Sequence, residues 1–201
     1  MLRKTSLAIL VGLSFSALAS AQEGFRQHDA HVHGQVEFNI AQDGHDLLLE
    51  ITAPGADVVG FEHAPENTEQ ENQLKAAVEK LSQADLMVQI NEAAKCTIEN
   101  VSVTHTLGGE EHDDHEHHDD HKHHDDHKHH DDHGHEHEHD GHGAFTVEYQ
   151  YHCDNVAALN ALETDWFKQF PATQAIQAYV LTDKVQSALA LSPAHNTVSL
   201  K

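Results

Sequence analysis

Histidine and acidic side chains crowd one stretch of the chain, residues 110–142. It reads EEHDDHEHHDDHKHHDDHKHHDDHGHEHEHDGH and holds fifteen of the 23 histidines, fourteen carboxylates and almost no apolar residue. A six-residue unit, HHDDHK or HHDDHG, repeats three times between His117 and Gly134. Neutral imidazole is the commonest side-chain ligand of transition metals, and carboxylates are secondary ligands. The stretch therefore predicts a multi-site binder of zinc or a similar ion.

No face of a regular helix or strand could be buried in this stretch, so we expect residues 110–142 to be a disordered, solvated loop. A polar spacer is one alternative, although spacers are built from Gly, Ser, Pro or Glu. An acid sensor is another, because imidazoles gain protons near pH ~6.5 and then release metal. The candidate metal ligands are His112, His115, His117, His118, His121, His123, His124, His127, His129, His130, His133, His135, His137, His139 and His142.

A second group of histidines precedes the first expected strand. It comprises His28, His31 and His33. In a strand His31 and His33 point to the same face and can bind one ion together. His63, beside Glu62 in the Gly- and Pro-punctuated connection 54–65, completes a site if that loop folds back on the strand. Exposed histidines with no fixed partner are the alternative.

The N-terminus has the three parts of a cleaved signal peptide. Arg3 and Lys4 form a basic start, residues 7–18 are apolar, and Ala19-Ser20-Ala21 is a cleavage site, so residues 1–21 should be removed after Ala21. The apolar part is too short to span a bilayer, so we expect no membrane insertion after cleavage. An exported, soluble, periplasmic protein is predicted. The formal net charge of −23 argues against nucleic acid and anionic membranes as partners and suits cations.

The chain has two cysteines, Cys96 and Cys153. An even pair in an oxidising compartment predicts a disulfide, and ligation of zinc by both thiols is the alternative. Residues 95–106 and 143–153 both look like strands. If they pair antiparallel with Cys96 opposite Cys153, Thr104 lies opposite Phe145.

Residues 34–53 predict a β-hairpin around a type I′ turn at Asp43-Gly44. A two-residue turn there pairs apolar residues on one face, so we expect three cross-strand pairs. They are Ile40 with Leu47, Phe38 with Leu49, and Val36 with Ile51.

The other elements predict an α+β fold, with antiparallel sheets of short strands and hairpins backed by one or two helices. Thr68 and Glu71 form a capping box for an amphipathic helix. Trp166, Phe167 and Phe170 should be core residues, and residues 155–163 fit either a strand or a helix. Residues 22–109 and 143–201 would form one folded domain. The expected elements are the helix 67–83, a strand 85–91, a short helix 164–170, a hairpin of 175–181 with 185–191, and a tail from 193 without an element.

Two short motifs carry a resemblance to a known family. HVHG (31–34) and GFEHAP (60–65), with the signal peptide and a His/Asp-rich insertion between two cysteine strands, resemble the ZrgA family of zinc-regulated, histidine-rich periplasmic proteins of Gram-negative bacteria. The resemblance implies a zinc-binding accessory to high-affinity zinc import. Its partner would be the periplasmic solute-binding protein of a zinc ABC transporter. It also implies a structured site that contains His31, His33 and His63.

Metal binding leaves several functions open. Capture of zinc for import is the first, and storage or detoxification is the second. Histidine ligands equally suit nickel and copper, since copper exceeds zinc in intrinsic affinity. A metalloenzyme is the third, but the sequence has no HExxH helix, nucleophile elbow or Gly-rich phosphate loop, and Glu62 is the only base candidate beside a ligand candidate. We therefore expect a binding protein and not an enzyme.

Overall fold

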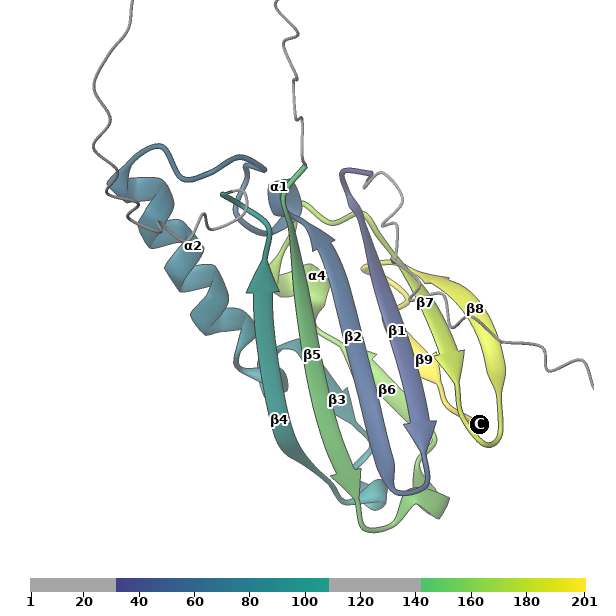
Figure 1. Cartoon of the computed structure of the whole chain (residues 1–201). Helices are drawn as coiled ribbons and strands as arrows, with labels where there is room; N and C mark the ends of the chain where they lie inside the picture. Colours follow the sequence, from purple (N-terminus) through teal and green to yellow (C-terminus); the bar gives the residue numbers. More distant parts are fainter. Residues whose placement is uncertain (1–31, 109–141) are drawn as a thin grey trace, which may run out of the picture.

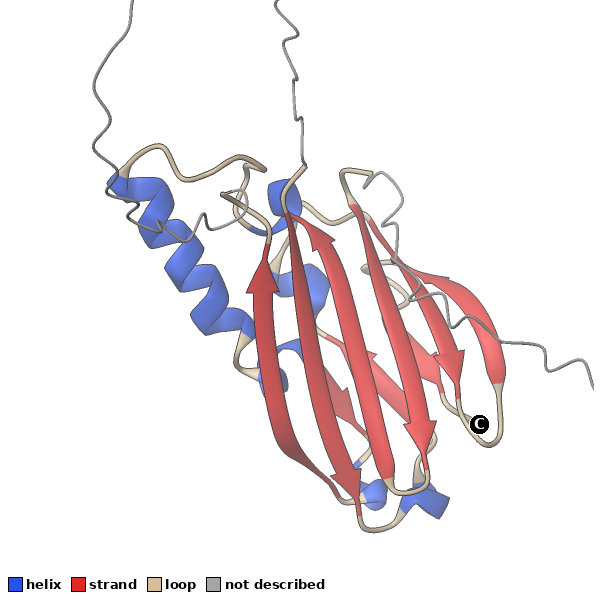
Figure 2. Cartoon of the chain, viewed as in Figure 1, coloured by secondary structure: helices blue, strands red, loops and turns tan. Residues whose placement is uncertain are grey.

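The computed structural model describes residues 32–108 and 142–201, which form two β-sheets with short helices and one longer helix (Figures 1 and 2). Within this part of the chain, the larger sheet has the strand order β4-β5-β2-β1-β7-β8 and the smaller sheet has the order β3-β6-β9. This arrangement confirms the α+β class. The strands are β1 Gln35–Asp43, β2 Asp46–Pro54, β3 Val88–Ile90, β4 Cys96–His105, β5 Ala144–Cys153, β6 Ala161–Thr164, β7 Ala175–Leu181, β8 Gln186–Leu191 and β9 Thr197–Ser199.

The helical elements occupy the connections between strands. They are α1 Gly55–Val58, α2 Thr68–Leu81, α3 Ala84–Met87 and α4 Trp166–Gln169, with 3-10 turns η1 Glu92–Ala94 and η2 Val156–Ala158. The N-cap of α2 is Asn67, whose side chain accepts a hydrogen bond from the Gln70 backbone N–H. The expected capping box of Thr68 and Glu71 is therefore wrong, because Asn67 takes the cap position one residue earlier.

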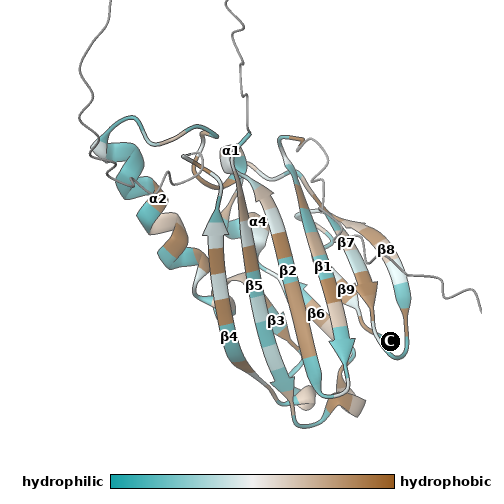
Figure 3. Ribbon diagram, viewed as in Figure 1, coloured by the Kyte–Doolittle hydropathy of each residue, from teal (hydrophilic) through white to brown (hydrophobic). Residues whose placement is uncertain are grey.

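The core lies between the two sheets, and α4 packs into it (Figure 1). Alternate residues of β1 face inward, so Phe38 is fully buried while its neighbour Glu37 is exposed. The resulting alternation of hydrophilic and hydrophobic residues along the strands is visible in Figure 3. Trp166 is fully buried with its ring edge-on to Phe38, at a centroid separation of 5.9 Å. Trp166, Phe167 and Phe170 are all buried, which confirms the expectation that they belong to the core.

The first hairpin exists, but its register differs from the expected one. Phe38 lies opposite Ile51 and Ile40 opposite Leu49. The turn is formed by Gly44 and His45, and only Gly44 has a positive φ, at 57°. A glycine at the first turn position suits a type II′ turn. The turn therefore lies one residue later in the chain than expected, and each residue of β1 lies opposite a residue of β2 two positions later than expected. The same side chains still face the core because the side-chain period is two.

The cysteine strands pair antiparallel, and a disulfide joins Cys96 to Cys153. The register is irregular between Ile98 and Asn100, so one residue of β4 is unpaired. Such a bulge shifts all later pairs by one. Thr104 therefore lies opposite Thr146, and His105 takes the place opposite Phe145. The predicted pairing of Thr104 with Phe145 is wrong for this reason.

Three other segments differ from expectation. Residues 85–91 are divided between α3 and β3, and the ambiguous segment 155–163 contains η2 and the start of β6. The tail contains β9, which pairs with β6. The β7–β8 hairpin is present as expected, but β7 also pairs with β1 in parallel, which joins the two ends of the chain in one sheet.

A helix long and apolar enough to cross a membrane is not found in residues 32–108 and 142–201.

Candidate metal centre

The order and direction of the strands bring three distant segments together at one end of the larger sheet. β2 and β4 end there, while β1 and β5 begin there (Figure 1). The residues just outside these strand ends therefore become neighbours. They are the turn before β1, the loop after α1 and the residues before β5.

His33 occupies the turn before β1. The Gln35 N–H donates to the Val32 carbonyl, and Gly34 has a φ of 81°. This is a type II turn, which requires a positive φ at its third residue and so favours glycine after His33. The Gly34 carbonyl accepts hydrogen bonds from the N–H groups of Gln174 and Ala175, at 2.8 and 3.0 Å. The turn that carries His33 is therefore held by the start of β7.

Glu62 lies in the loop that follows α1. Gly60 ends this short helix with a φ of 88°, and Phe61 is buried. The Phe61 ring anchors the loop in the core, so the next residue projects at the end of the sheet. The Glu62 side chain is only 13% exposed.

His142 precedes β5 and is fixed by the backbone beside it. The Gly143 N–H donates to the Glu62 carbonyl at 2.9 Å, and the Gly143 carbonyl accepts from the Gly55 N–H at 2.7 Å. A Cβ on Gly143 would lie 2.5 Å from the Glu62 carbonyl oxygen, and a Cβ on Gly55 would lie 2.5 Å from the Phe61 carbonyl oxygen. Two residues without side chains thus allow the close backbone contact that sets Glu62 beside His142.

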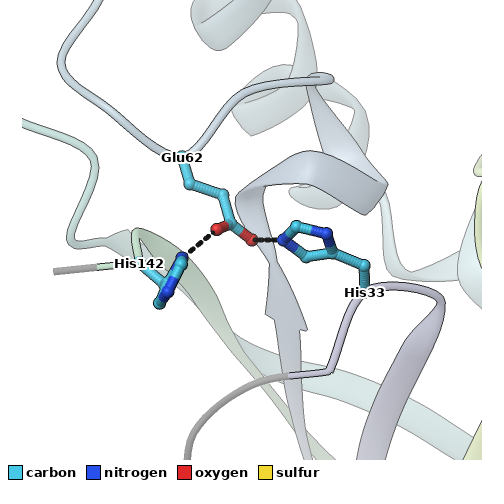
Figure 4. Close-up of side chains that lie close together, drawn as sticks. All are labelled: His33, Glu62 and His142. Atoms are coloured by element: carbon cyan, nitrogen blue, oxygen red, sulfur yellow. Dashed lines mark hydrogen bonds and ion pairs between the residues drawn. The ribbon is translucent and has the colours of Figure 1, made fainter. Parts of the chain in front are cut away.

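The three side chains converge, as Figure 4 shows. The Nε2 of His33 lies 3.0 Å from Oε1 of Glu62, and the Nδ1 of His142 lies 2.6 Å from Oε2. One ligand atom from each residue lies within 4.8 Å of the other two. Ligand atoms around one tetrahedral zinc ion lie about 3.3 Å apart. The group is therefore close to the size of a metal site.

The state of Glu62 favours a cation at this position. Its Oε1 is buried and accepts no hydrogen bond of good geometry from any described residue, even though His33 Nε2 is near. Burial raises the pKa of the Glu62 carboxyl, but its contacts with His33 and His142 outweigh that effect and hold the pKa below its ordinary value. The carboxylate is thus charged at neutral pH, and one of its oxygens has a lone pair available to an ion.

Two imidazoles and one carboxylate are a ligand set that zinc accepts, and three protein ligands leave a fourth position open. The imidazoles are also accessible, since the side chains of His33 and His142 are 64% and 56% exposed. A site of this kind can exchange its ion with water or with ligands from another molecule. It is chemically suited to transfer more than to permanent structural binding.

Only some of the residues expected to form this site lie close together in the structure. His33 and His142 lie in it, but His63 does not. The His63 ring stacks on Phe61 and its Nδ1 lies 2.7 Å from the Ala64 carbonyl oxygen. His28, His31 and the histidines from His112 to His139 lie outside the described residues.

Sequence reasoning did not include Glu62 among the candidate ligands, and it placed His142 in the loop 110–142. Glu62 and His63 are adjacent in the GFEHAP motif, in which His63 was the expected ligand and Glu62 only a candidate base. A glycine directly follows each of the two histidines, Gly34 after His33 and Gly143 after His142, but no comparable signal marks Glu62.

The sequence matches a known protein family. A family model described as ZrgA family zinc uptake protein matches residues 30–200. The matched range contains His33, Glu62 and His142. No curated protein matches the sequence.

Proposed function

The chain belongs to the ZrgA family of zinc uptake proteins, and from this premise we propose that it is a periplasmic zinc-binding protein that captures zinc and assists its high-affinity import. In this proposal His33, Glu62 and His142 hold one zinc ion at the end of the larger sheet. The protein binds and delivers zinc and catalyses no reaction. Glu62 acts as a ligand, which removes the one general base considered for a metalloenzyme.

The observation that carries the proposal is the convergence of two exposed imidazoles on the largely buried carboxylate of Glu62, with one ligand atom of each residue within 4.8 Å of the other two. A divalent cation held between the three side chains would compensate the negative charge of this buried carboxylate. The imidazoles then provide neutral ligands, so the bound site carries a net charge of about +1. This arrangement suits an ion that is held and later released.

Residues 110–142 would capture zinc from solution before it reaches the structured site. They would form a loop between the two parts of one folded domain, residues 22–109 and 143–201, and bind zinc at many weak sites. The loop is covalently continuous with His142, so an ion released from it stays at high effective concentration near the structured site. His28 and His31 would add ligands from the N-terminal side, and His63 lies one residue from Glu62.

Location and partner follow from the same premise. The signal sequence 1–21, with cleavage after Ala21, supports export to the periplasm, and the Cys96–Cys153 disulfide is consistent with an oxidising compartment. The receiving partner would be the periplasmic solute-binding protein of a zinc ABC transporter. An open fourth position lets an incoming ligand of that partner bind the ion before the protein releases it.

Calorimetric titration of the mature chain with zinc at neutral pH tests the site. Replacing residues 110–141 with a short Gly/Ser linker should remove the weak sites and leave one tight site, because His142 is retained. Glu62→Gln in that background should lower the affinity of the tight site by about 10- to 100-fold. Glu66→Gln, which changes an exposed carboxylate four residues away, is the matched control.

Tight binding that is unchanged in Glu62→Gln would place the site elsewhere. Loss of all tight binding together with residues 110–141 would support the alternative function, a periplasmic buffer that stores or detoxifies zinc, nickel or copper. Growth separates the two functions, since an import accessory is needed when zinc is chelated and a store is needed when metal is in excess.

A further inference from the structure

Two more histidines meet at the opposite end of the larger sheet. His45 lies in the turn between β1 and β2, and His152 is the penultimate residue of β5. The strands between the two ends have nine or ten residues, so the two ends are about 30 Å apart. The pair of His45 and His152 is therefore separate from the metal centre at His33, Glu62 and His142.

Both imidazoles are held through the same ring atom. The Nδ1 of His45 lies 2.9 Å from the Cys153 carbonyl oxygen, and the Nδ1 of His152 lies 2.9 Å from Oδ1 of Asp46. A carbonyl and a carboxylate can only accept hydrogen bonds, so each Nδ1 carries the hydrogen. In the neutral form each Nε2 then has a free lone pair. Metal-binding histidines are typically oriented in this way, by a carbonyl or carboxylate on the nitrogen that does not bind.

The two rings also lie at a suitable separation. They are stacked with centroids 5.6 Å apart and an interplanar angle of 23°. Two imidazoles that bind one tetrahedral ion through nitrogen have centroids about 5 Å apart. The His45 residue is exposed, and the His152 side chain is 41% exposed. Both rings are accessible from solvent. Because each Nε2 lone pair lies in the plane of its ring, the nearly parallel rings must rotate before both nitrogens face one ion.

The electrostatic surroundings favour a cation. Asp46 contacts His152, and Glu99 and Asp154 act on the same ring from nearby positions. Neutral imidazoles would supply the ligand atoms, while the three carboxylates would offset the charge of the ion.

We propose that His45 and His152 form a second metal site, which binds one zinc-like divalent ion through the two Nε2 atoms, with water in the remaining positions. With two protein ligands, the site is weaker and exchanges faster than the three-ligand centre. It would give the folded part of the chain an open metal site at each end of the larger sheet. The inference does not depend on the proposed import function or on the first site.

The test uses nitrogen NMR of the histidine rings in the full mature chain at slightly alkaline pH. Before zinc is added, both residues should be in the tautomer with hydrogen on Nδ1, which is the minor form of free histidine. During titration to saturation, the Nε2 signals of His45 and His152 should shift together with one midpoint. His152→Ala should weaken the zinc response of His45 by about tenfold or more.

Two controls separate this site from other effects. His195→Ala removes another exposed histidine and should leave both responses unchanged, as should Glu62→Gln. His152→Gln, checked by the backbone amide signals of its neighbours, guards against a loss of folding in the alanine variant. Signals that do not shift at saturation, that shift with different midpoints, or that persist for His45 in both His152 variants would overturn the proposal.

Discussion

The backbone N–H of Gly34 donates a 2.8 Å hydrogen bond to Oδ1 of Asp57, which follows it by 23 residues in the chain. Asp57 is only 5% exposed, and its other oxygen accepts from the Thr173 hydroxyl at 3.0 Å. Thr173 in turn accepts from Trp166 Nε1. A buried network thus fixes the turn that carries His33, and Asp57 is the residue that positions this candidate ligand from outside the group of His33, Glu62 and His142.

Removal of Asp57 should weaken both the fold and the metal centre. Asp57→Ala leaves the Gly34 N–H without its acceptor, and we expect a loss of about 1–3 kcal/mol in the free energy of unfolding. Zinc affinity at the structured site should also fall, and this fall should disappear in a His33→Ala background. Chemical denaturation and zinc titration of the four combinations measure both effects.

Thr164→Ala is the matched control for Asp57→Ala. Thr164 is also a buried polar residue, and its hydroxyl donates to the carbonyl of Met87, the last residue of α3. It should lower stability and leave zinc affinity unchanged. A similar affinity loss in Thr164→Ala would show that Asp57 acts only through global stability.

A methyl group at Gly143 should separate Glu62 from His142. In Gly143→Ala the new Cβ meets the Glu62 carbonyl oxygen at 2.5 Å, so the loop and β5 must move apart. We expect zinc affinity at the structured site to fall by about tenfold or more, by analogy with the loss of supporting groups in other metal sites. Calorimetry in the linker variant measures it. Gly44→Ala is the comparison, because its Cβ meets nothing within 4 Å; it should cost stability through its positive φ and leave zinc affinity intact.

Removal of the hydroxyl group should lower the free energy of unfolding at Tyr149 but not at Tyr151. The Tyr149 hydroxyl donates to the Leu81 carbonyl and ties the end of α2 to β5. Tyr149→Phe should cost about 1–2 kcal/mol. The Tyr151 hydroxyl is buried without a partner among the described residues, so Tyr151→Phe should be neutral or stabilising. Urea denaturation measures the free energy of unfolding of both variants. Equal losses in the two would contradict a hydrogen bond from the Tyr149 hydroxyl and its absence at Tyr151.

Alkaline conditions should destabilise the protein through the same two residues. Burial raises the pKa of both tyrosines, and Asp85 raises that of Tyr151 further. The unfolded chain releases these protons near pH ~10 while the folded chain keeps them, so this contribution to stability is complete below that pH and is lost as pH rises. Phenolate absorbance and the unfolding midpoint, followed together, should show that these tyrosines ionise when the protein unfolds. Their ionisation in a still folded protein would contradict the prediction.

Reduction of the disulfide should lower the melting temperature. Cys96 and Cys153 are 57 residues apart in the chain, and closing a loop of that length stabilises by about 4 kcal/mol in the chain-entropy model. For a chain of this size the expected decrease is about 10 °C. Scanning calorimetry with and without reductant measures it, and a Cys96→Ser/Cys153→Ser variant should melt at the reduced value under both conditions. An unchanged melting temperature in that variant would contradict the assigned stabilisation.

Sequence patterns were sufficient for the long strands and for α2, and insufficient for short elements and for the exact register of the strands. Alternating apolar residues predicted β1 and β2 correctly, but the turn moved to Gly44 because a positive φ is needed there. The disulfide was predicted from Cys96 and Cys153 alone, while the bulge after Ile98 was not, since an extra residue on an edge strand leaves no sequence signature. β9 was missed because three residues carry too little periodicity.

The candidate metal centre contains two of the histidines that the sequence singled out, His33 and His142. The HVHG motif indicated His33, and the density of histidines indicated metal binding. The partnership of His33 with Glu62 and His142 depends on strand order, which spacing along the chain does not give. The parallel pairing of β1 with β7 was equally hidden, because it joins residues from opposite ends of the sequence.

That parallel pairing has a consequence for the order of folding. The chain emerges from its N-terminal end, so the β1–β2 hairpin can form early, but β1 stays unpaired on its other side until residues 175–181 have appeared. The Gly34 carbonyl, which fixes the turn of His33, likewise waits for Gln174 and Ala175. Contacts so distant in sequence form slowly. A chain that has not reached residue 175 therefore lacks part of the support of the His33 turn, and the candidate metal centre takes its full form only after the N-terminal and C-terminal parts of the sheet have joined.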